Sequence, residues 1–156
     1  LGLVLVYITF RFQWRQGIAA IITLLHDVMV VVGIFSIFDK EFTLPVIAAL
    51  LTVVGYSLND TIVIFDRIRE NISKFRKREL LPLINQSVTE TLSRTLLTSG
   101  TTLMVVLALV FLGGEIIHDF AFALLVGVLI GTYSSIYVAS PTVLWLTKIA
   151  PPKTSD

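Results

Sequence analysis

The 156-residue sequence contains no cysteine, which excludes disulfide bonds and thiolate metal sites. Charged residues are also scarce, at 15% of the chain against about 25% in typical soluble domains. Hydrophobic residues make up 55% of the chain, and its mean hydropathy is +0.88. This composition predicts an all-α membrane protein, because spanning helices need long apolar runs.

Sequence motifs for enzymatic chemistry are missing too. No glycine-rich phosphate loop precedes a helix, and no G-x-S-x-G turn is present. His26 and His118 lie far apart and lack the spacing of metal ligands. The net charge of +1 is spread over short basic runs between apolar segments, so it does not indicate a nucleic-acid partner. We therefore expect no enzyme, no metal, no cofactor and no nucleic acid.

Five apolar segments predict a bundle of five transmembrane helices, each full span needing about 20 residues. The first is too short to cross a membrane and resembles a truncated helix, while the other four are long enough. The chain begins inside an apolar run, without Met or a secretory signal, so we expect it to be part of a longer polypeptide. The five segments are residues 1–12, 17–38, 43–65, 95–112 and 119–147.

The connection over residues 66–94 is longer and more polar than the others. Its apolar residues at 83, 84, 88 and 92 recur near helical spacing after Pro82. We expect a basic cytoplasmic loop that contains an interfacial helix lying along the membrane surface. The last span is longer than a bilayer requires, so it is expected to tilt or to break at Pro141.

The basic residues predict the orientation of the bundle. Every Lys and Arg except Lys40 falls in or beside the first loop, the 66–94 loop or the tail 148–156. Loops rich in Lys and Arg lie on the cytoplasmic side. The C-terminus is therefore expected in the cytoplasm, with the N-terminal segment approaching from outside.

Asp60 is a carboxylate inside the predicted span 43–65. A charge near the bilayer centre costs at least about 2.5–3.5 kcal/mol, so such residues usually carry protons or ions, or are tightly paired. No charged residue lies one turn before or after Asp60, so its partner must come from another helix. Thr98 and Ser99 lie at a similar depth, and Arg94 lies one turn nearer the cytoplasm. We predict a proton relay inside the bundle that comprises Asp60, Arg94, Asn59, Thr98, Ser99 and Asp27.

Each of these residues also has a structural interpretation. The hydroxyls of Thr98 and Ser99 could bond to backbone carbonyls or join neighbouring helices. Arg94 could extend to the membrane surface, or pair with Asp60. Asp27, near the centre of span 17–38, could belong to the relay, or form a buried network with His26 and a neighbouring hydroxyl.

Two further groups are interpreted as structural. Asp66 and Arg67 lie at the membrane edge, where charge is tolerated, and predict an interfacial ion pair. Gly127, Gly131 and Ser135 recur every four residues. Such a face of small residues is typical of close helix packing.

The stretch VGYSLNDTIVIFDRIREN, residues 54–71, resembles the signature of the SecF members of the SecD/SecF family. Further segments resemble the same family: FRFQWR at 10–15, His26-Asp27, TLSRTLLTSGTT at 91–102 and GTYSSIYVA at 131–139. The resemblance covers nearly the whole chain. The Asn-Asp pair, Asn59 and Asp60, followed by FDRIREN separates it from the SecD members.

This resemblance implies a fold and a function. SecF proteins belong to the resistance-nodulation-division superfamily and have six spanning helices, with an external domain between the first two. This chain would then be helices two to six. The family works with SecD beside the SecYEG channel, often with YajC, in the bacterial inner membrane, and uses the proton-motive force to assist preprotein translocation. The acid of the Asn-Asp pair, here Asp60, is the proton-linked residue, and Arg94 is also implicated.

Two other functions are compatible with the residues alone. One is an assembly module of the translocation machinery, in which Asp60 only bonds helices together. The other is a bundle of another resistance-nodulation-division transporter.

Overall fold

The computed structural model describes residues 14–75 and 79–149. In these residues the chain forms α2 (Trp14–Ile37), α3 (Leu44–Lys74), α4 (Leu80–Leu112), α5 (Glu115–Ser134), the π-helical turn η1 (Ser135–Ala139) and α6 (Ser140–Ile149). Four stretches are long and apolar enough to cross a membrane, with α5, η1 and α6 forming one of them. The expected truncated helix, residues 1–12, lies outside the described residues, as does most of the tail.

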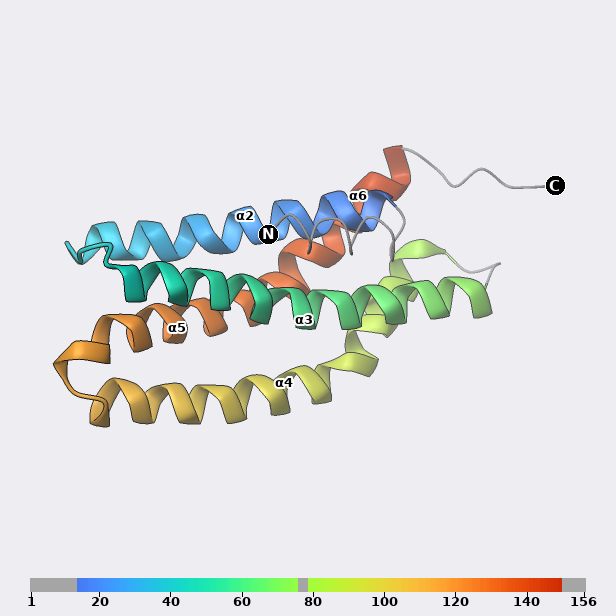
Figure 1. Cartoon of the computed structure of the whole chain (residues 1–156). Coiled ribbons are helices and arrows are strands. Elements are labelled where there is room, and N and C mark those ends of the chain that lie inside the picture. Colours follow the sequence, from blue (N-terminus) through green and yellow to red (C-terminus); the bar gives the residue numbers. More distant parts are fainter. Residues whose placement is uncertain (1–13, 76–78, 150–156) are drawn as a thin grey trace.

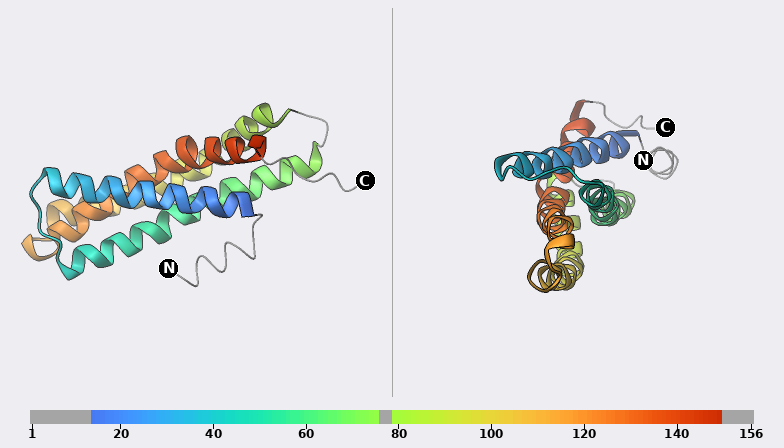
Figure 2. Two further views of the ribbon diagram at one scale, coloured as in Figure 1. Left: turned by 90° about the horizontal axis from the view of Figure 1, so that it is seen from above. Right: turned by 60° about the vertical axis from the view of Figure 1, so that its left-hand side comes forward.

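The helices lie side by side in one elongated bundle (Figures 1 and 2). α3 and α5 make the most extensive contact, and α2 packs against both of them. α4 lies on the other side of α3 and α5 from α2, which leaves it the least covered of the four candidate spans. Asp60 on α3 is therefore placed in the interior, between the outer helices.

Short turns join the helices at one end of the bundle. Asp39, in the turn between α2 and α3, has a φ of 50°, a conformation that Asp tolerates better than most residues. Pro45 lies in the first turn of α3, where backbone N–H groups have no partner within the helix, so proline costs no helical hydrogen bond there. Gly114 has a φ of 73° and connects α4 to α5. These residues hold adjacent helices antiparallel.

The polar segment 66–94 is not a separate element in the structure. α3 continues to Lys74 and α4 begins at Leu80, so residues 66–74 and 80–94 of the segment belong to the ends of two long helices. The first turns of α4, lime in Figure 1, lie at an angle to the rest of the helix. The Thr91 hydroxyl donates to the Ser87 and Val88 carbonyls there, a bonding pattern that bends helices.

The expected break at Pro141 is absent, because the helix runs through this residue from α5 to α6. A single π-helical turn, Ser135–Ala139, comes directly before it. Proline lacks a backbone N–H, and its ring crowds the preceding helical turn. A π-helical turn is wider than an α-helical turn, so it accommodates the ring and the lost hydrogen bond.

Candidate functional site

Asp60 is 4% exposed, and its Oδ2 atom has no hydrogen-bond partner among the described residues. α3 places it on the buried face that also carries Ser57 and Ile64. A buried charge without donors is costly, so this environment suits the protonated carboxyl better than the carboxylate. Asp60 is therefore an ionisable group inside the bundle, and its role in a proton relay stays a prediction.

Neither a hydrogen bond nor an ion pair joins Arg94 to Asp60 in the described part of the chain. Arg94 lies on an exposed face of α4. The two residues are therefore not paired in this conformation, and a part for Arg94 in a proton relay stays a prediction.

Asp27 is fully buried, and both of its carboxylate oxygens have partners. The Ser57 hydroxyl donates to Oδ2 at 2.5 Å, and Nδ1 of His26 lies 3.1 Å from Oδ1. This is the predicted network of Asp27, His26 and a neighbouring hydroxyl. Sequence analysis did not identify Ser57, although its position three residues before Asp60 indicates the same helix face.

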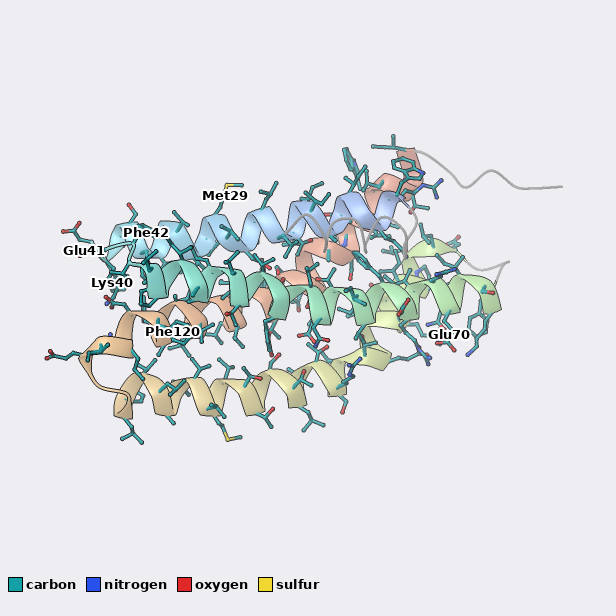
Figure 3. All side chains as sticks on the ribbon, in the orientation of Figure 1. Met29, Lys40, Glu41, Phe42, Glu70 and Phe120 are labelled. Atoms are coloured by element: carbon teal, nitrogen blue, oxygen red, sulfur yellow. The ribbon has the colours of Figure 1, made fainter. Side chains whose placement is uncertain are left out.

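His26 lies at the edge of the bundle, with 36% of its side chain exposed. It lines a shallow apolar groove of about 400 Å³ together with Met29 and Leu25. Figure 3 shows Met29 pointing away from the bundle, so the groove opens on the outer face of α2. The Asp27 network thus extends from the buried core to this outer face.

Gly127 and Gly131 lie where α5 crosses α3. A Cβ atom at Gly127 would lie 2.0 Å from a methyl group of Val53. At Gly131 it would lie 3.2 Å from Cβ of Ser57. The two backbones therefore approach too closely for larger residues. Ser135 is also buried, and its hydroxyl donates to the Thr132 carbonyl.

A chain of hydroxyls joins three helices. Tyr56 donates to Oγ of Ser99 at 3.2 Å, and Ser99 lies 2.7 Å from Oγ1 of Thr132. Thr132 donates to the Val128 carbonyl, so Ser99 is the donor to Thr132. Ser99 therefore links α3, α4 and α5. Sequence analysis predicted Ser99 but not Tyr56 or Thr132, which carry no local signal.

Two predicted relay residues lie elsewhere. The Thr98 hydroxyl donates to the carbonyls of Arg94 and Thr95. In this conformation Thr98 therefore bonds to backbone carbonyls of its own helix, which is the structural alternative to a place in the relay. Asn59 is exposed, whereas the adjacent Asp60 is buried. Neither residue contacts the Asp60 carboxyl in this conformation.

Arg67 forms ion pairs with Glu70 at 2.6 Å and Glu90 at 2.5 Å, and the interfacial pair with Asp66 stays a prediction. Adjacent helix residues point in different directions, whereas residues three apart are neighbours. Asn71 also donates to Glu90 and to Ser87. These bonds fasten the end of α3 to the start of α4.

The hydrogen bonds from Asn71, Gln86 and Arg67 lower the pKa of the Glu90 carboxyl to about 2. Glu90 lies in the charged segment 66–94, outside the apolar part of α4. Figure 3 shows that Glu70 of this cluster and Lys40 lie at opposite ends of the bundle. Lys40 pairs with Asp119 at 2.5 Å and fastens α5 to the turn between α2 and α3.

No group of three His, Cys, Asp or Glu residues that could hold a metal ion occurs in residues 14–75 and 79–149. The described interior contains two buried acids on adjacent helices: both oxygens of Asp27 have hydrogen-bond partners, and Oδ2 of Asp60 has none. Together with the apolar spans, this defines a polytopic helical membrane protein with ionisable groups inside its bundle.

The family follows from the sequence match. The family model described as "Protein export membrane protein SecD/SecF, C-terminal" matches residues 1–149. The chain therefore belongs to the SecD/SecF family, which decides against another transporter of the superfamily. It is 57% identical over 143 residues to the protein translocase subunit SecF of Vibrio alginolyticus, covering 92% of this chain and 45% of that one. The corresponding SecF of Desulfurispirillum indicum is 59% identical over 140 residues, covering 88% and 45%.

Solved structures agree with this assignment. The crystal structure of SecDF from Thermus thermophilus matches with a TM-score of 0.91 and 52% identity, over 94% of this chain and 20% of that chain. SecDF in its super-membrane-facing form matches with a TM-score of 0.89 and 52% identity, over 95% and 20%. The chain spans less than half the length of these SecF relatives.

Proposed function

We propose that this chain is the membrane bundle of a SecF-type subunit of the protein-export machinery, which uses the proton-motive force to assist preprotein translocation. The names of its relatives, protein translocase subunits SecF and SecDF, support the assignment to protein export. The observation that carries the proton-linked role is Asp60, buried at 4% exposure with no donor to Oδ2.

In the proposed cycle Asp60 takes a proton from the outer side and releases it inward, toward Thr98 and Arg94. Burial of a carboxyl favours its protonated form, and an approaching guanidinium such as that of Arg94 would favour the charged form. A movement of α4 relative to α3 would change the balance between the two forms. The proton gradient then biases a two-state bundle, which moves the external domain expected in the full-length protein.

The proposed partners are SecD, the SecYEG channel and YajC, with preprotein bound through that external domain. The SecDF relative, in which both names occur in one chain, supports the SecD pairing. The proposed location is the bacterial inner membrane, with five spans in this chain and a cytoplasmic C-terminus. The first turns of α4 are proposed to lie along the cytoplasmic membrane surface as the interfacial helix.

The test is Asp60→Asn in the full-length protein, reconstituted with its partners in membrane vesicles. Asn retains the shape and most hydrogen bonds but cannot carry a proton. We expect export to lose its dependence on the proton gradient while the protein still assembles. Asp39→Asn is the matched control, because Asp39 is exposed in a turn whose positive φ Asn also tolerates. Unchanged proton-driven export in Asp60→Asn would refute the carrier role.

A second function, that of an assembly module, is favoured by the exposed apolar surface of α4. Only 17% of the most apolar stretch of this helix is buried inside the bundle. Such a surface must contact lipid or another subunit. The same substitution separates the two functions, since an assembly module would tolerate Asn at position 60 in every assay.

A further inference from the structure

The hydroxyl of Ser57 is bonded to one buried acid, Asp27 of α2, and lies one helical turn from a second, Asp60 of α3. Ser57 donates to Oδ2 of Asp27 at 2.5 Å. Asp60 lies three residues further along α3, where side chains are neighbours, with Cβ atoms about 5–6 Å apart. Asp27 thus has its donor, whereas Oδ2 of Asp60 has none in the described structure.

The other groups around this pair leave Ser57 as the adjustable donor. α2 contributes His26, which is bonded to Asp27, and α4 contributes Arg94, which makes no contact with Asp60. On α5 and η1 the residues at this level are uncharged, and the hydroxyls of Ser134 and Ser135 donate to backbone carbonyls. The charged residues of α5 lie in its first turns, at the far end of the bundle.

Ser57 is fully buried against Gly131 of α5, which presents no side chain to it. A Cβ atom at that glycine would lie 3.5 Å from the Ser57 Oγ atom. Serine side chains occupy three staggered positions, so a turn about χ1 is the change that would carry the hydroxyl from one neighbour to another.

We propose that Ser57 is a positioning residue that donates its hydroxyl to Asp27 while Asp60 is protonated, and turns to Asp60 when Asp60 gives up its proton. A hydroxyl has a single donor hydrogen, so it serves one acid at a time. Ser57 keeps its own proton in both states, and the proton that moves is the one bound to Asp60. This inference rests on the proposed proton-linked function and adds the group that stabilises the charged acid.

The test measures proton-driven export by the full-length protein, with its partners in membrane vesicles, over a series of pH values. Ser57→Ala removes the donor from the charged acid, so the pH of half-maximal activity should rise by about 1–2 units, as expected for a lost hydrogen bond to a charge. Ser134→Ala is the matched control, since Ser134 is equally buried but bonds only to a carbonyl. Its midpoint should equal that of the wild type.

A second variant covers the case in which Ser57→Ala does not accumulate. Asp27→Asn removes the charged acceptor that competes for the hydroxyl, so the midpoint should fall below that of the wild type. An unmoved midpoint in either variant, while Asp60→Asn abolishes proton-driven export, overturns the role of Ser57 and leaves the proposed function standing. Full activity of Asp60→Asn overturns both.

Discussion

Gly127→Ala is expected to destabilise the bundle, although alanine is the better helix former. The added Cβ would lie 2.0, 2.7 and 2.9 Å from three carbon atoms of Val53. Val53 is fully buried and, as a β-branched residue in a helix, has one strongly preferred rotamer, so it cannot turn away. The helices must therefore move apart at their most extensive contact.

The size of the effect follows from two opposing terms. Overpacking typically costs about 1–3 kcal/mol, and contacts this short place the cost near the upper end. Replacing glycine by alanine inside a helix returns about 1 kcal/mol. We expect a net loss of about 2 kcal/mol in the free energy of unfolding, measured on the full-length protein in detergent by thermal or denaturant unfolding.

Gly33→Ala is the matched control, because a Cβ there meets nothing within 4 Å. That variant should be as stable as the wild type or slightly more stable. Adding Val53→Ala to Gly127→Ala should recover part of the loss by making room for the new methyl group. If Gly127→Ala were as stable as Gly33→Ala, the close approach of α3 and α5 would be refuted.

Two further predictions concern polar contacts. Glu90→Gln should be less stable than the wild type near neutral pH. The ionised carboxylate of Glu90 accepts hydrogen bonds from neighbouring side chains, and one of these donors, Arg67, also pairs with it as an ion. The pKa of the Glu90 carboxyl is lowered from 4.5 to about 2 in the folded protein. The stabilisation from its ionised form is therefore complete above pH 4.5 and disappears as the pH falls through about 2. Unfolding curves of both proteins at several pH values measure this difference. Ser99→Ala should lower the free energy of unfolding by about 1 kcal/mol for each lost hydrogen bond, to Tyr56 and to Thr132. A variant as stable as the wild type would contradict this prediction.

The sequence predicts the spans well and the polar ends of the helices poorly. Apolar runs locate four spans because the bilayer requires a local property of the chain. Residues 66–94 lack such a run, and the helical parts of this segment, 66–74 and 80–94, are supported by contacts such as Asn71 with Ser87. Those contacts join residues on different helices, which no local pattern records.

The same distinction applies to the candidate site. Asp60 and Asp27 are recognisable individually, because an acid in an apolar run is unusual wherever it occurs. The partner of Asp27 is 30 residues away on α3, so sequence predicts its kind but not its identity. The outward position of Arg94 depends on how α4 packs, which sequence leaves open.

The π-helical turn Ser135–Ala139 has a consequence for the last span as a whole. One extra residue in a turn rotates every later side chain about the helix axis by about 100°. The stretch before the turn presents its small residues to α3, and the stretch after it, α6, packs against α2 and α4. A single continuous helix can therefore pack against neighbours that lie in two different directions. Deleting one residue within the turn would rotate α6 away from its contacts and would leave the α3–α5 contact in register.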